Sequence, residues 1–138
     1  MRYRSGFEKK FAKWLTENKI KFEYEKNKLL YRHKIFQGQC GHCNSKDVYV
    51  NKDYLPDFVL KNGIFLELKG KFTSQMRTKM KEVFDANPGI DLRMVFMYDN
   101  WLTKKHTMRY SDWCKKNGIK YHVVKDKHKP TIPKTWTR

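Results

Sequence analysis

Residues 56–69 read PDFVLKNGIFLELK, and this stretch decides how the chain folds. Two short apolar runs flank residues 61–63, whose Lys-Asn-Gly sequence is typical of the loop of a β-hairpin. When those three residues form the loop, Phe58 pairs with Leu66 on the neighbouring strand. The pattern therefore predicts an antiparallel hairpin.

Side-chain alternation then places the polar residues of the hairpin on one face. Because successive side chains of a strand point to opposite faces, Asp57 lies directly opposite Glu67, and Lys69 follows on the same face. The other face carries only apolar residues, namely Phe58, Leu60, Ile64, Leu66 and Leu68. A two-residue Asn-Gly loop would shift the register by one and mix polar with apolar side chains on both faces. The hydrophobic pattern favours the three-residue loop.

Two carboxylates and an amine that converge in this way suit metal-dependent chemistry. Adjacent anions raise each other's pKa unless a cation neutralises them. Oxygen ligands suit Mg²⁺ or Mn²⁺, which also bind phosphate oxygens. Pro-Asp, nine further residues and Glu-x-Lys form a pattern typical of nucleases that hydrolyse phosphodiesters, with Lys69 orienting water or stabilising the transition state. The alternative is a surface cluster of cross-strand charges.

The composition points to a single basic domain. In 138 residues, 31 Lys and Arg stand against 14 Asp and Glu, which gives a net charge of +17. Such a charge needs a polyanionic partner, and nucleic acid is the first candidate. With 39% hydrophobic and 15% aromatic residues the chain can build a core, which argues against disorder. Without an apolar membrane span or a signal segment, and with an odd count of three cysteines, we expect a cytoplasmic protein and no membrane partner.

Hydrophobic periodicity and turn residues predict helices on a mixed sheet. We expect helices at 5–18, 73–86 and 111–117, and strands at 20–24, 29–36, 54–60, 64–71, 92–98 and 119–124. The expected order is α-β-β-β-β-α-β-α-β, an α/β fold in which helices flank a mixed β-sheet. Residues 37–52 break the pattern with glycines and two cysteines, and we expect a loop insertion there.

Two local motifs carry alternative interpretations. Ser5-Gly6-Phe7-Glu8 fits a capping box, in which the Glu8 carboxylate accepts the Ser5 N–H. Cys40 and Cys43, spaced as Cys-x-x-Cys, fit half of a zinc knuckle. A histidine of the same chain, or the Cys pair of a second subunit, would have to complete a Zn²⁺ site. Zinc binding and ordinary loop cysteines both remain open.

Several stretches resemble one known family in the same order along the chain. They are residues 4–8, 20–25, 56–58, 62–70, 91–96, 118–120 and 132–136. They resemble phage endonuclease I, the T-seven-type Holliday junction resolvases of the PD-(D/E)XK nuclease superfamily. The resemblance implies a restriction-endonuclease-like core and a homodimer. It further implies that 1–138 form one nuclease domain whose residues 1–27 are exchanged between subunits.

The resemblance also implies roles for the site residues. Asp57 would bridge two Mg²⁺ or Mn²⁺ ions, with Glu67 and the Leu68 backbone carbonyl holding one of them. Glu8 would hold the other in the partner's site, a role that replaces the capping interpretation. Lys69 would lie beside the attacking water. These four side chains, Glu8, Asp57, Glu67 and Lys69, are the expected catalytic set.

The activity implied by the resemblance is the paired cleavage of four-way and other branched DNA junctions, in the cytoplasm of a bacterial host. The basic N-terminal extension of the family is nearly absent from this sequence, so we expect other cationic residues to bind the DNA. The expected DNA-binding residues are Arg2, Arg4, Lys71, Lys104, Lys105 and Arg109. The alternatives are a restriction-type or nicking endonuclease of the same fold and a non-catalytic basic DNA-binding protein.

Overall fold

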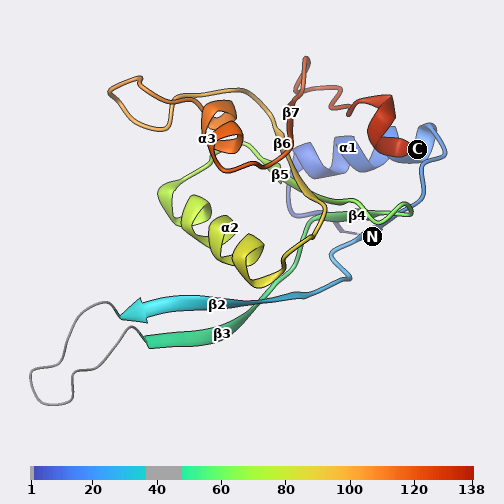
Figure 1. The fold of residues 1–138 in the computed structure, drawn as a ribbon. Coiled ribbons are helices and arrows are strands. Elements are labelled where there is room, and N and C mark those ends of the chain that lie inside the picture. The colour runs from blue at the N-terminus through green and yellow to red at the C-terminus, as the bar shows by residue number, and fades with distance from the viewer. Residues whose placement is uncertain (1, 37–47) are drawn as a thin grey trace, which may run out of the picture.

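The computed structural model describes residues 2–36 and 48–138 (Figure 1). In chain order the elements are α1 (Gly6–Glu17), β1 (Phe22–Tyr24), β2 (Leu29–Phe36), β3 (Val48–Tyr54), β4 (Phe58–Leu60), β5 (Phe65–Lys69), α2 (Ser74–Ala86), β6 (Leu92–Phe96), α3 (Tyr110–Lys116), β7 (Tyr121–Val123) and the 3₁₀ helix η1 (Lys134–Thr137). None of the helices among these residues is long and apolar enough to cross a membrane.

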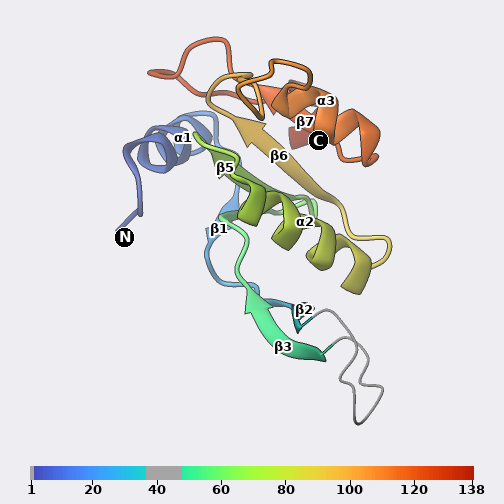
Figure 2. The same ribbon diagram turned by 90° about the vertical axis from the view of Figure 1, so that its left-hand side faces the viewer.

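A mixed sheet of five strands forms the centre of the molecule, in the order β1-β4-β5-β6-β7. Strands β1, β4 and β5 pair antiparallel, whereas β5, β6 and β7 pair parallel. Helix α1 lies on one side of this sheet, and α2 and α3 lie on the other (Figure 2). The predicted α/β fold with helices that flank a mixed sheet is confirmed.

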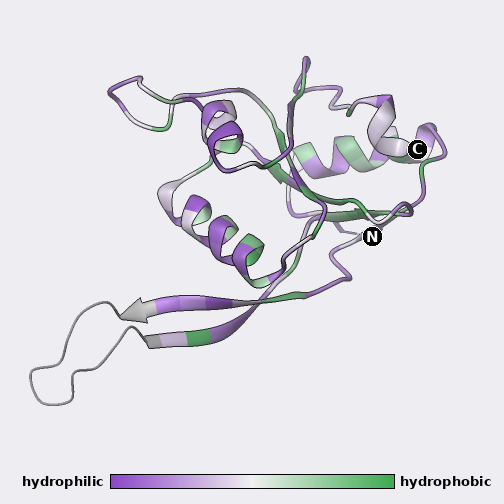
Figure 3. Cartoon of the chain, in the orientation of Figure 1, coloured by the Kyte–Doolittle hydropathy of each residue, from purple (hydrophilic) through white to green (hydrophobic). Residues whose placement is uncertain are grey.

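Each face of the sheet is covered by its own hydrophobic core. Phe11 and Leu15 of α1 pack with the apolar face of the hairpin, and Met80 and Trp113 pack on the opposite side. On β6, Val95 lies in the first core, whereas Met94 and Phe96 lie in the second. Hydrophobic residues gather on the central strands (Figure 3). Because both faces are covered, a polar side chain on this sheet is withdrawn from water.

The hairpin has the predicted register. Phe58 pairs with Leu66, and the Leu60 N–H donates to the Ile64 carbonyl at 2.9 Å. Gly63 has a φ of 91°, a left-handed conformation that side chains disfavour. All five residues of the predicted apolar face lie in one core. The three-residue loop is therefore confirmed.

The prediction of a loop over residues 37–52 is wrong from residue 48 onward. Strand β3 pairs antiparallel with β2 as a separate two-stranded sheet, the ribbon, which projects from the body (Figure 1). Tyr54 ends β3, and Pro56 separates it from β4, so the predicted strand 54–60 is shorter than expected. Cys40 and Cys43 lie outside the described residues.

Candidate active site

The polar face of the hairpin carries the first three residues of the site. Asp57 lies directly before β4, and its Oδ2 accepts the Leu68 N–H at 2.8 Å. Lys69 Nζ lies 3.0 Å from Glu67 Oε1. Asp57 and Glu67 are only 6% and 3% exposed. The hairpin thus holds two buried carboxylates and an ammonium group close together, as the register predicted.

Glu8 joins these groups from the first turn of α1. Its N–H donates to Ser5 Oγ at 3.1 Å, so Ser5 caps the helix as expected. Its carboxylate, however, accepts the Arg4 N–H at 3.2 Å and the hydroxyl of Tyr24. The prediction that the Glu8 carboxylate accepts the Ser5 N–H is therefore wrong, because these two donors turn the carboxylate toward β1.

Glu25 is a site residue that the sequence did not reveal. One carboxylate oxygen each of Glu8, Glu25 and Asp57 lies within 4.8 Å of the other two. Glu25 follows β1 with a φ of 49°, and its N–H donates to the Asp57 carbonyl at 3.1 Å. Its Oε1 also lies 2.7 Å from Arg4 Nε. The left-handed backbone redirects a side chain that strand alternation would send to solvent.

These three carboxylates form a candidate metal centre. Their ligand atoms are all oxygens, without imidazole or thiol among them. Hard oxygen ligands suit divalent cations such as Mg²⁺, Mn²⁺ or Ca²⁺ rather than a zinc-type site. The donor set therefore fits a hard divalent cation.

Burial and neighbouring anions govern the charge of Asp57. Burial, followed by the carboxylates of Glu67 and Glu8, raises the pKa of Asp57 to about 8. The Leu68 N–H and the Lys69 ammonium lower this pKa only in part. Without metal, Asp57 therefore carries a proton at neutral pH, and a cation that binds there must displace it.

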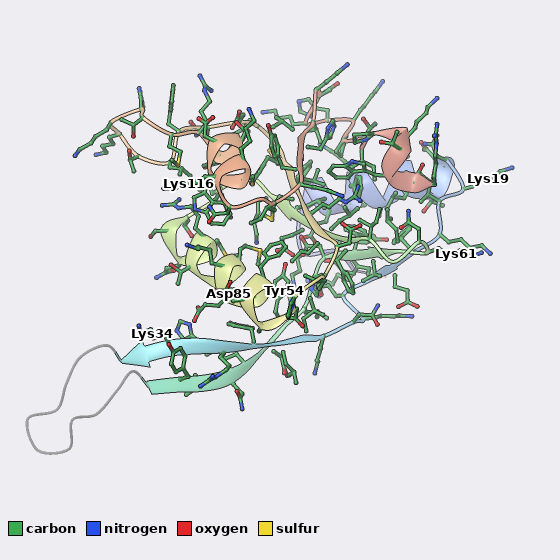
Figure 4. All side chains as sticks on the ribbon, in the orientation of Figure 1. Lys19, Lys34, Tyr54, Lys61, Asp85 and Lys116 are labelled. Carbon is green, nitrogen blue, oxygen red and sulfur yellow. The ribbon has the colours of Figure 1, made fainter. Side chains whose placement is uncertain are left out.

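Two buried tyrosines fix the orientation of the carboxylates. Tyr54 donates its hydroxyl to Glu67, and Tyr24 donates its hydroxyl to Glu8. Burial is the main reason why the pKa of each phenol is raised, so both hydroxyls stay protonated and remain donors. Tyr54 lies at the base of the ribbon, beside α2 (Figure 4).

The model of the phage endonuclease I family matches residues 1–138. The chain belongs to the phage endonuclease I family. Endonuclease I of Escherichia phage T7 is 37% identical over 120 residues, which cover 86% of this chain and 71% of that relative. Endodeoxyribonuclease 1 of Enterobacteria phage T3 is 36% identical over 118 residues, which cover 85% of this chain and 68% of the relative. The chain is therefore a nuclease, as its resemblance to the family predicted.

The DNA-binding residues expected for this phage endonuclease I family member lie at the surface. Arg2, Arg4, Lys71, Lys104, Lys105 and Arg109 are all exposed. In the loop after β6, the guanidinium of Arg109 lies 4.1 Å from the ring centroid of Trp101, and the rings of Trp101 and His106 stack 5.1 Å apart. Lys69 pairs with Phe96, so this loop starts at the same end of the sheet as the site.

The third cysteine of the endonuclease is part of the core. Cys114 is buried on α3, and burial raises the pKa of its thiol to about 12. A neutral, buried thiol is a poor metal ligand. Cys114 is therefore not a candidate third ligand for zinc. A zinc site at Cys40 and Cys43 remains a prediction.

Proposed function

We propose that this endonuclease is a homodimer that resolves four-way and other branched DNA junctions by paired, metal-dependent hydrolysis of phosphodiesters. The convergence of Glu8, Asp57, Glu67 and Lys69 carries the proposal, because it unites oxygen ligands with a cation. The net charge of +17 supports a polyanionic substrate. One relative is named as an endodeoxyribonuclease, which supports DNA in particular.

Carboxylates of the chain would hold two Mg²⁺ or Mn²⁺ ions. Asp57 would be shared between the two ions, with Glu67 and the Leu68 carbonyl on one side and Glu8 on the other. Glu25 would join Glu8 as a further ligand, since one of its carboxylate oxygens lies in the same cluster. Such ions, when bound, lower the pKa of a coordinated water and neutralise charge on the phosphate.

Lys69 supplies the fixed positive charge of the site. Its ammonium group is held 3.0 Å from Glu67, whose other carboxylate oxygen accepts the Tyr54 hydroxyl. Lys69 therefore enters the reaction already oriented, beside the place that the phosphate would occupy. There it stabilises the negative charge that grows on the phosphate oxygens when water attacks.

The dimer is proposed to exchange residues 1–27 between two single-domain subunits with a restriction-endonuclease-like core. Within one chain, Glu8 already lies beside Asp57. An exchange of identical segments keeps this contact and makes it intermolecular. Each site would then combine Glu8 of one subunit with the hairpin of the other, and the two-fold symmetry suits cuts in opposed strands.

A cleavage assay tests the proposal. The protein is incubated with a labelled four-way junction, or with linear duplexes of the same sequences, in Mg²⁺ or in EDTA. We expect paired nicks in the junction in Mg²⁺ alone. Asp57→Ala should lose at least about 10³-fold in rate, because it removes the shared ligand. Asp85→Ala is the matched control, since Asp85 is an exposed carboxylate on α2 (Figure 4).

The other outcomes separate the alternatives. Cuts at fixed positions of the linear duplex would identify a restriction-type enzyme. Single nicks without a paired cut would identify a nicking enzyme. Undiminished cleavage by Asp57→Ala would show that the hairpin is not the active site.

A further inference from the structure

Lys79 of α2 lies beside the site without an acidic partner. Its Nζ lies 5.0 Å from the ring centroid of Tyr54, the residue that holds Glu67. In residues 2–36 and 48–138, no carboxylate forms an ion pair with this ammonium group and no acceptor forms a hydrogen bond with it. The side chain is half-buried, so water solvates the charge only in part. A partly desolvated ammonium group would be stabilised by a bound anion.

The charges of cations from three other segments act on Lys79. Burial is the main cause that lowers the pKa of Lys79, and the charges of Lys69, Lys52 and Arg4 lower it further. Glu67 alone raises this pKa, and Glu67 is already paired with Lys69. The four cations repel one another in the protein alone, and a bound anion would relieve that repulsion.

The fold places Lys52 and Lys79 on the same side of the ribbon. Lys52 and Tyr54 share one face of β3, since they are two residues apart. The residue opposite Lys52 is Tyr31, which is buried in the core shared with α2. Lys52 therefore lies on the α2 side of the ribbon. Lys52 and Lys79 thus extend the positively charged region that begins at Lys69.

We propose that Lys79, together with Lys52 on the same side of the ribbon, binds a backbone phosphate of the DNA strand that is cleaved, next to the site of Glu67 and Lys69. The proposal rests on the proposed function, because its ligand is the DNA substrate. A backbone phosphate fits better than a free anion, because the chain belongs to a nuclease family and Lys52 is exposed on the ribbon. Lys79 is thus a DNA contact rather than a ligand of the metal.

The test measures binding separately from cleavage. Lys79→Met keeps an apolar chain over the Tyr54 ring and removes the charge, whereas Lys79→Arg keeps the charge. Lys81→Met is the control, because Lys81 is exposed on another face of α2. Binding of a labelled four-way junction is measured in EDTA over a series of salt concentrations, and kcat and KM are measured in Mg²⁺.

We expect Lys79→Met to weaken junction binding about five- to tenfold near 0.1 M salt and to reduce the slope of log K against log salt by about one. Lys79→Arg and Lys81→Met should keep the wild-type slope. If Lys79→Met does not fold, as judged by circular dichroism, Lys79→Gln replaces it.

Two results would overturn the proposal. The first is a Lys79→Met protein with unchanged affinity and unchanged salt slope. The second is a loss of kcat with affinity and slope unchanged, which would mean that Lys79 acts only through Tyr54. A wild-type protein that cuts no DNA would contradict the proposed function instead, and the binding series in EDTA would still decide on the phosphate contact.

Discussion

The protonated state of Asp57 has a direct consequence for stability. Its pKa in the folded chain is about 8, against an ordinary value of 3.8, so the native state binds more protons than the unfolded state between these values. The metal-free protein therefore loses stability as the pH rises from about 4 to about 8. Asp57→Asn removes this loss, because a neutral amide has no proton to release.

In EDTA at pH 8 we expect Asp57→Asn to melt at least roughly 4 °C above the wild type, which corresponds to at least about 1 kcal/mol. The difference should vanish near pH 4, where the wild-type carboxyl is protonated in both states. Thermal unfolding followed by circular dichroism measures both points, with Asp85→Asn as the exposed control. An Asn variant that melts below the wild type at pH 8 would show that Asp57 is ionised in the metal-free fold.

Glu25 can be tested through metal binding in the absence of DNA. Glu25→Gln keeps the shape of the side chain but removes one of three anionic ligands. We expect its Kd for Mn²⁺, measured by titration calorimetry, to rise at least about tenfold. Glu17→Gln on the exposed surface of α1 should bind Mn²⁺ as the wild type does. Equal Mn²⁺ affinities for wild type and Glu25→Gln would remove Glu25 from the metal centre.

At the scale of elements, one carboxylate fastens the ribbon to α2. Glu82 Oε1 lies 2.9 Å from His33 Nδ1, and Glu82 Oε2 accepts the Lys34 N–H at 2.8 Å. The ribbon ends in Tyr54, which orients Glu67. A loose ribbon should therefore harm both stability and cleavage.

We expect Glu82→Ala to lower the free energy of unfolding by about 1 to 3 kcal/mol, because it removes the carboxylate that contacts both His33 and the Lys34 N–H. Its kcat should fall while the affinity for DNA changes little. Glu82→Gln should lose less, since its amide oxygen can still accept the Lys34 N–H. Urea unfolding and junction cleavage measure the two effects, and an Ala variant as stable as the wild type would contradict the fastening role.

The elements show what sequence patterns can and cannot predict. The hairpin and its register were predictable, because an apolar face with period two allows only one pairing around the loop. The starts of α1 and α2 were predictable from Ser5 and Thr73, whose side chains cap the N-termini of these helices. Strand β3 was missed although Val48, Tyr49 and Val50 favour a strand, because residues 51–53 are poor strand formers and the pairing with β2 is a tertiary effect.

The site shows a similar division. Strand alternation and the known nuclease pattern indicated Asp57, Glu67 and Lys69, which the structure brings together. Glu25 could not be predicted, because its left-handed φ breaks the alternation on which the argument depends. Tyr54 was not recognised either, since nothing in the sequence distinguishes it from an ordinary core tyrosine.

At the scale of the whole molecule, the exchange of residues 1–27 predicts that two inactive variants complement each other. Glu8→Ala and Asp57→Ala homodimers each lack a complete site. After the two are unfolded together and refolded, a mixed dimer with exchanged segments has one intact site and one doubly mutated site. We expect it to nick junctions once, at up to about half the wild-type rate of nicking.

The unmixed variants and a mixture of folded homodimers at low temperature are the controls. A dimer without exchange would place both changes within their own subunits, so the refolded mixture would stay inactive. Size-exclusion chromatography with light scattering should first show the dimer mass. A monomer at micromolar concentration would contradict the proposed assembly before any activity is measured.

The carboxylate cluster draws on distant parts of the chain, from residue 8 at the start of α1 to residue 67 on β5. During synthesis, the ribosome releases the first of these long before the second, and the covering helices α2 and α3 emerge later still. A nascent or half-folded chain can adhere to nucleic acid through its lysines, yet its carboxylates remain apart. Cleavage of DNA therefore begins only when folding is finished. The time at which cleavage activity appears would report the rate of the last folding step.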